Sequence, residues 1–104
     1  MRIDAKEWLN NEYTEFDGFQ EENGGREFVD RLIAAGAKVE VDEDDISETE
    51  DQDVVVHFVT NCYITMPDDI SKTLDIVEIM VDEIELFRGI DRVSDHCISI
   101  GWGA

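Results

Sequence analysis

The side chains that could do chemistry in this 104-residue sequence are mainly carboxylates. Asp and Glu number 27 against 8 Lys and Arg, which gives a formal net charge of −19. Two groups of them stand out: a row with spacings of three and four residues, and a run without any Lys or Arg. The row consists of Asp75, Glu78, Asp82 and Glu85, and the run contributes Asp42, Glu43, Asp44, Asp45, Glu48, Glu50 and Asp51.

These eleven carboxylates predict a surface that imitates nucleic acid. On a helix, side chains three and four residues apart have Cβ atoms about 5–6 Å from one another. B-DNA carries one phosphate for about every 3.4 Å of rise along each strand. A protein groove lined with Lys and Arg would bind such a row with fast, salt-sensitive kinetics. We therefore expect the eleven residues to form a site for a basic protein partner.

A long strand followed by a helix should position the row of four carboxylates. Residues 54–66 alternate between mostly apolar and half-polar side chains, which predicts one β-strand with one face against a core. Pro67 ends the strand, and Asp68 and Asp69 suit the start of a helix. Apolar residues at steps of three and four then predict a helix that places its carboxylate row on the solvent side. The expected core stripe is Ile70, Leu74, Val77, Val81, Ile84 and Phe87.

The rest of the chain predicts a small single domain over residues 1–104. Residues 3–13, capped by Asp4, and 26–35, ended by Gly36, read as helices. Residues 37–41 and 95–102 read as strands, and residues 43–53 as an exposed connection between antiparallel strands. The last strand should run parallel to the preceding one if the two are adjacent, or antiparallel to the first strand if it lies on the far side of the sheet.

The expected fold class is therefore α+β. We predict an antiparallel or mixed sheet of about three strands with helices packed on one face, in the order ααββαβ, a ferredoxin-like variant. Phe16 and Phe19 are expected to fold back onto the core, and the alternative is that they or Trp102 anchor a partner.

Composition excludes several functions. The negative charge repels nucleic acid and anionic membranes, so neither is an expected partner. The sequence shows no secretory leader and no apolar run of membrane-spanning length, which predicts a cytoplasmic protein. Cys62 and Cys97 should be reduced thiols that point to different layers, because their strand parities differ.

No arrangement typical of catalysis is present. His57 and Cys62 have opposite parity on one strand, as do His96 and Cys97 on another, so a closed metal site is not expected. The acidic run fails the calcium-loop pattern, and a Gly-rich phosphate loop is absent. We predict no enzyme, no metal and no cofactor.

Size, charge and predicted class give a first resemblance over the whole chain. Small, strongly acidic α+β chains of this kind resemble the anti-CRISPR and anti-restriction DNA mimics of phages and mobile elements. This resemblance implies a non-enzymatic inhibitor of a nuclease or of a CRISPR or restriction effector. A phage-encoded inhibitor would act in the cytoplasm of the host cell.

A second resemblance covers roughly residues 28–103. The helix and glycine turn in FVDRLIAAGAKVEV, the acidic link, the apolar strand DVVVHFVTNCYI and the helix in MPDDISKTLDIVEIMVDEI are followed by a late Gly-Trp-Gly. This order is similar to the ribonuclease E inhibitor family, regulator of ribonuclease activity B. That family has a Tyr-Asp-Gly-Trp run where this chain has Ile100-Gly101-Trp102-Gly103, and this chain lacks the acidic tail.

Three alternatives to a DNA-mimicking inhibitor stay open. The chain could be an immunity protein that covers the basic active site of a toxin nuclease, or a ribonuclease-regulating protein. A solvated acidic surface adapted to high salt would need no partner at all. The sequence also leaves open whether the chain forms a homodimer.

Overall fold

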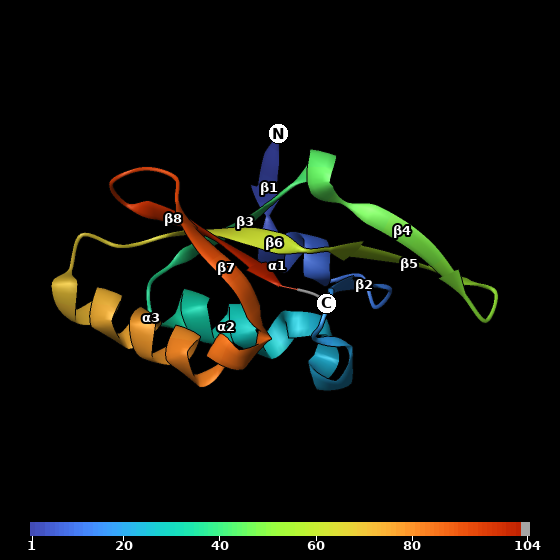
Figure 1. The fold of residues 1–104 in the computed structure, drawn as a ribbon, viewed down its shortest axis with the longest axis horizontal. Helices are drawn as coiled ribbons and strands as arrows, with labels where there is room; N and C mark the ends of the chain where they lie inside the picture. The colour runs from blue at the N-terminus through green and yellow to red at the C-terminus, as the bar shows by residue number, and fades with distance from the viewer. Residues whose placement is uncertain (103–104) are drawn as a thin grey trace.

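The computed structural model describes residues 1–102, apart from the side chains of residues 20–22 and 51. The fold is α+β, as expected, but it is built on two sheets (Figure 1). The larger sheet is antiparallel throughout, and its strands lie in the order β1 (Arg2–Asp4), β3 (Lys38–Asp42), β6 (Asn61–Thr65), β8 (Cys97–Trp102) and β7 (Phe87–Arg92). The smaller sheet has the order β2 (Thr14–Phe16), β5 (Val54–Val59) and β4 (Ser47–Asp51). In it β5 runs parallel to β2 and antiparallel to β4.

The helices cover one face of the larger sheet. They are α1 (Ala5–Leu9), α2 (Arg26–Ala34) and α3 (Ile70–Asp82), and α2 and α3 lie side by side below the sheet in Figure 1. Short 3-10 turns occur at η1 (Gln20–Gly25), η2 (Glu43–Asp45) and η3 (Ile84–Leu86). The expectation that helices pack on one sheet face is confirmed for this sheet.

Local sequence explains where the helices begin and end. The Asp4 carboxylate accepts a hydrogen bond from the Glu7 amide at 3.0 Å and caps α1, as predicted. Asp69 caps α3 by accepting from the amides of Ser71 and Lys72 at 2.8 and 3.2 Å. Gly36 follows α2 with φ of +106°, a conformation that glycine adopts without strain.

The predicted single strand over residues 54–66 is wrong, because the chain changes sheets at Thr60. Val59 and Cys62 are both fully buried although their parities differ. The Thr60 carbonyl accepts a hydrogen bond from the Trp102 amide at 2.8 Å instead of continuing one ladder. β5 therefore belongs to the smaller sheet, while β6 pairs with β3, the antiparallel pairing that the sequence predicted.

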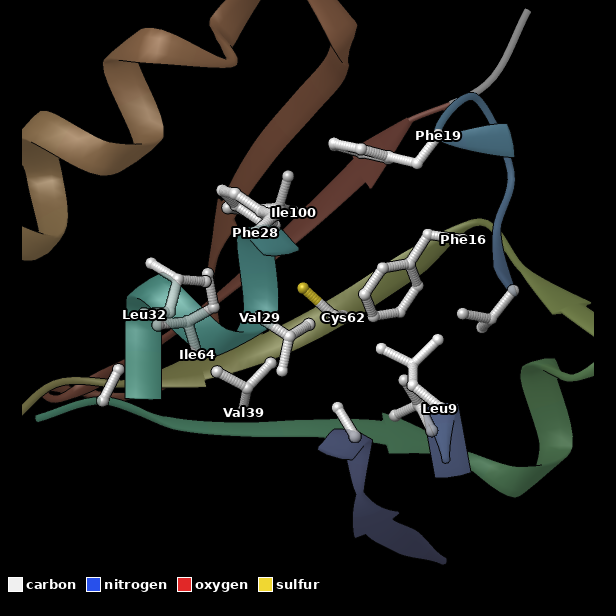
Figure 2. Packing of buried hydrophobic residues seen from close by; sticks show 14 of the residues in the cluster. Leu9, Phe16, Phe19, Phe28, Val29, Leu32, Val39, Cys62, Ile64 and Ile100 are labelled. Atoms are coloured by element: carbon white, nitrogen blue, oxygen red, sulfur yellow. The ribbon is translucent and has the colours of Figure 1, made fainter. Parts of the chain in front are cut away.

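An aromatic cluster joins the two sheets and the helices. The Trp102 ring lies 4.7 Å from Phe16 and 5.3 Å from Phe19, measured between centroids. All three side chains are at most 1% exposed, and Figure 2 shows Phe16 beside Cys62, with Phe19 above it in the same buried cluster. The expected burial of Phe16 and Phe19 is thus confirmed, and neither they nor Trp102 can anchor a partner at the surface.

The predicted orientation of α3 is wrong. Ile76 and Met80 are its buried residues, and they face the core together with half-buried Ile79. Of the six residues predicted to form the core stripe, Phe87 is half-buried and packs against the core, but the other five lie largely in solvent. They are Ile70, Leu74, Val77, Val81 and Ile84.

Four strands were not predicted, and the element order is therefore not ααββαβ. β1 and β2 flank a first helix much shorter than residues 3–13, and β4 forms within the segment predicted as a connection. The helix predicted to reach Phe87 ends at Asp82, and β7 begins at Phe87. Because β7 and β8 form a hairpin, β8 enters the sheet antiparallel to β6, which overturns the expectation of a parallel neighbour.

Candidate partner-binding surface

The carboxylate row of α3 is on the surface. Asp75, Glu78, Asp82 and Glu85 are all exposed, the first three on α3 and Glu85 in η3 just beyond it. One of them has an internal partner: Arg31 Nη2 of α2 donates to Asp82 Oδ2 at 2.8 Å. The Asp82 side chain remains 60% exposed, so its carboxylate still faces solvent.

The first part of the acidic run has a structural role at Asp42. Its Oδ1 accepts from the Asp44 amide at 2.9 Å and from the terminal amine of Met1 at 3.3 Å. The hydrogen bond from the Asp44 amide and the positive charge of the amine hold the pKa of Asp42 below its usual value. Glu43, Asp44 and Asp45 follow in η2, and all three are exposed.

The second part of the run forms β4, one of the two edge strands of the smaller sheet. Glu48 lies opposite His57 and Glu50 opposite Val55, so both glutamates project from the same sheet face. Glu48 Oε2 is 3.9 Å from His57 Nδ1. Asp51 ends β4, and its side chain lies outside the described part of the structure. Charged residues on an edge strand also prevent pairing with strands of other molecules.

The two acidic groups do not form one patch. The β4–β5 hairpin projects from the body of the molecule, at the opposite end from the start of α3 (Figure 1). The molecule is 46 Å long and only 27 by 23 Å across, and both groups are spread along its length. A partner that contacts both must therefore present an extended surface.

Several cations contact groups other than these carboxylates. Arg26 donates to four backbone carbonyls, those of Leu9, Asn11, Thr14 and Asn23, and so ties α2 to the N-terminal segment. The Arg2 guanidinium lies 4.0 Å from the centre of the Tyr63 ring. Three further pairs join neighbouring side chains: Lys6 with Asp30, Lys38 with Glu40, and Arg92 with Asp95. In the described residues, Glu43, Asp45, Glu50, Asp75, Glu78 and Glu85 have no cationic side chain within 4 Å.

Cysteine and histidine form no site in the described part of the chain. Cys62 and Cys97 are both buried free thiols. The β6–β8 register places Cys97 opposite Thr65, so these two side chains project from the same face of the sheet. Thr65 is an odd number of residues from Cys62, and Cys62 and Cys97 therefore face different sides of the sheet, as predicted. Burial raises the pKa of the Cys62 thiol, which keeps it protonated at neutral pH. Residues 1–102, as described, contain no group of three or more potential metal ligands.

The structure also contains features that the sequence reading missed. An exposed apolar stripe on α3 borders the carboxylate row. The three- and four-residue spacing of this stripe is visible in the sequence, but it was interpreted as the face that packs on the core. A cavity of about 240 Å³ lies between α2 and the end of α3. Its lining is Phe19, Glu27, Phe28, Arg31 and Glu83.

Comparison with protein-family models, curated proteins and solved structures found no match. In the described part of the chain, no helix has both the length and the apolar character needed to span a bilayer. The carboxylates and their surroundings are accordingly the features that indicate a function.

Proposed function

We propose that this protein is a non-enzymatic inhibitor that binds the positively charged nucleic-acid-binding surface of a nuclease or of a CRISPR or restriction effector. Its carboxylates would take the places of phosphates. One observation carries the proposal: within the described residues, exposed carboxylates with no cationic side chain within 4 Å are displayed on α3, at Asp75 and Glu78, and on β4, at Glu50. A net charge of −19 on an elongated body makes a basic partner the expected one.

Regular backbone fixes the spacing of these charges. Glu48 and Glu50 lie two residues apart on one face of β4, which separates them by about 6.6 Å along the strand. This separation is about twice the rise per phosphate in one strand of B-DNA. Asp75 and Glu78 are three residues apart on α3, at about 5–6 Å between Cβ atoms. Charges held by hydrogen-bonded elements need little ordering when a partner binds.

The hairpin suits insertion into a groove. β4 and β5 extend beyond the body (Figure 1). β4 is an edge strand, and its residues Glu48 and Glu50 are exposed on one face of the smaller sheet. A protein groove that binds nucleic acid is lined with Lys and Arg and is shaped for a narrow anionic ligand. The α3 row would then contact a second part of the same partner. The partner would meet this protein in the cytoplasm of the cell, where nucleases and their regulators act.

Capture of the partner tests the proposal. Immobilised wild-type protein is exposed to a bacterial lysate, and retained proteins are eluted with duplex DNA or with RNA. We expect a nucleic-acid-cleaving protein to elute and its activity to be inhibited by stoichiometric amounts of the wild-type protein. A matched bait carries Asn or Gln at Glu43, Asp44, Asp45, Glu48 and Glu50. Retention that neither nucleic acid nor the amide bait alters would contradict phosphate mimicry.

A further inference from the structure

Helix α3 has two apolar faces, and only one of them belongs to the core. Ile76 and Met80 are buried against the body of the protein. The other face carries four aliphatic residues, and a fifth follows in η3; the exposed fractions of the five run from 41% at Val77 to 77% at Ile70. They follow one another at steps of four, three, four and three residues, the repeat of a coiled-coil seam. They are Ile70, Leu74, Val77, Val81 and Ile84.

The edge strand β7 also carries an exposed apolar residue. Ile90 of β7 lies opposite Ile100 of β8, whose side chain is buried on the helix-covered face. Ile90 therefore projects from that same face, yet it is 48% exposed because β7 is the last strand of the sheet. Single exposed aliphatic residues are normal on a protein, but a regular row of five indicates an interaction surface.

Carboxylates border this stripe on one side only. With about 100° of rotation per residue, Glu78 lies directly beside the stripe on α3, and Asp75 and Asp82 lie further round in the same direction. Glu85 follows in η3, just beyond the end of the helix. Buried Met80 lies on the opposite side of the stripe. A helix that docks on the stripe would thus meet the body of the protein on one flank and carboxylates on the other.

A second copy of this chain is a poor occupant. Each copy carries a net charge of −19, so two copies repel one another. In an antiparallel two-fold pair of α3 helices, the flank with Glu78 and Glu85 would lie against the same flank of the other copy. Like charges would then face one another along that flank of the contact.

We propose that the exposed face of α3 docks a cationic amphipathic helix of the protein partner. Its aliphatic side chains pack on Leu74, Val77 and Val81, and its Lys or Arg side chains pair with Glu78 and Glu85. Helices recognised in this way place anchors at i, i+3, i+4 and i+7, which matches the repeat on α3. The inference rests on the proposed function in one respect, namely that the partner is basic. It adds an apolar contact that nucleic acid does not provide.

A designed peptide tests the docking site. The probe is a 21-residue helix with Leu at the seam positions and Lys elsewhere, a length of about three heptads. A scrambled peptide of identical composition is the matched control, because it keeps the charge and destroys the seam. We expect wild-type protein to bind the probe at least tenfold more tightly than the scrambled peptide, measured by fluorescence anisotropy.

Two variants of the protein complete the test. Leu74→Gln with Val81→Gln should weaken binding of the probe at least tenfold, and Glu78→Gln with Glu85→Gln should weaken it and reduce its salt dependence. Val55→Gln, an exposed aliphatic residue of the hairpin, should bind as wild type does. Circular dichroism melts verify that each variant is folded. The variant with Leu74→Gln and Val81→Gln is called the stripe variant. The proposal would be overturned if wild type bound the probe and the scrambled peptide equally, or if the stripe variant bound the probe as tightly as wild type does. A wild-type dimer, seen by sedimentation, that the stripe variant abolishes would also overturn it.

The same variants separate this inference from the proposed function. If the stripe variant still inhibits a DNA-displaceable partner and binds the probe as wild type does, phosphate mimicry stands and the docking site is wrong. If wild type binds the probe through the stripe but no captured partner is displaced by nucleic acid, the docking site stands and mimicry is wrong.

Discussion

Arg31 of α2 donates a hydrogen bond to Asp82 of α3 at 2.8 Å, so that the carboxylate row of α3 meets α2 at Asp82. Ile76 and Met80 then face the core, while Val77 and Val81 face solvent. Both side chains of the ion pair are largely exposed, so the pair itself should contribute only about 0–1 kcal/mol. The orientation of α3 thus depends mainly on the burial of its second apolar face.

A pair of substitutions tests this orientation. Ile76→Ala should lower the free energy of unfolding by about 2–5 kcal/mol, because it leaves a cavity in the core. Val81→Asp should cost less than about 1 kcal/mol, since Val81 is 56% exposed and the new charge meets only solvent and nearby carboxylates. Urea denaturation measures both values. A large loss with Val81→Asp and a small one with Ile76→Ala would mean that the opposite face is buried.

The pKa of Asp42 gives a prediction about acid stability. Its folded-state pKa lies below the usual 3.8, because the carboxylate accepts from the Asp44 amide and faces the terminal amine. A carboxyl group of this kind stabilises the fold above its unfolded-state pKa, and the contribution is lost as the pH falls through the lowered folded-state pKa. We expect an NMR titration of the Asp42 carboxyl to show a midpoint below 3.8. Asp42→Asn should make stability less dependent on pH in this acid range, and a midpoint above 3.8 would refute the capping role.

Thermal melts separate a partner-binding surface from adaptation to salt. A halophilic protein should unfold as salt is removed, because the repulsion among its carboxylates is no longer screened. A nucleic-acid mimic should stay folded in tens of millimolar salt, since it must act where electrostatic attraction is strong. Melting curves at low and at molar salt, followed by circular dichroism, decide between them. A chain that is unfolded at low salt would contradict the proposed function.

Local patterns predicted the parts of the fold that depend on neighbouring residues. The caps at Asp4 and Gly36 and the pairing of residues 38–40 with 63–65 follow from side-chain chemistry and alternation. Residues 54–66 were predicted as one strand because their alternation is continuous in sequence. The break at Thr60 depends on the Trp102 amide, which is distant in the chain and cannot be inferred from spacing.

The helix shows why periodicity alone was insufficient for the site. Steps of three and four predicted an apolar stripe on α3, and the stripe exists, but a second set at Ile76, Ile79 and Met80 provides the core contact. A helix with two apolar sets does not reveal which of them the fold buries. The solvent exposure of the carboxylate row was predicted correctly, because no carboxylate of that row lies on the buried side. Its wide separation from the hairpin was not predicted, since it depends on the placement of the two sheets.

Grouped removal of charge tests the central claim most directly. A helix set changes Asp75, Glu78, Asp82 and Glu85 to Asn or Gln, and a hairpin set changes Glu43, Asp44, Asp45, Glu48 and Glu50 likewise. Amides keep the shape of each side chain and remove its charge, and sets are needed because one exposed charge contributes only about 0–1 kcal/mol. The measurement is affinity for the captured partner over a series of salt concentrations. We predict that at least one set weakens binding at least tenfold and flattens its salt dependence, and that duplex DNA or RNA competes with the wild-type protein. Wild-type affinity and salt dependence in both sets would contradict the account.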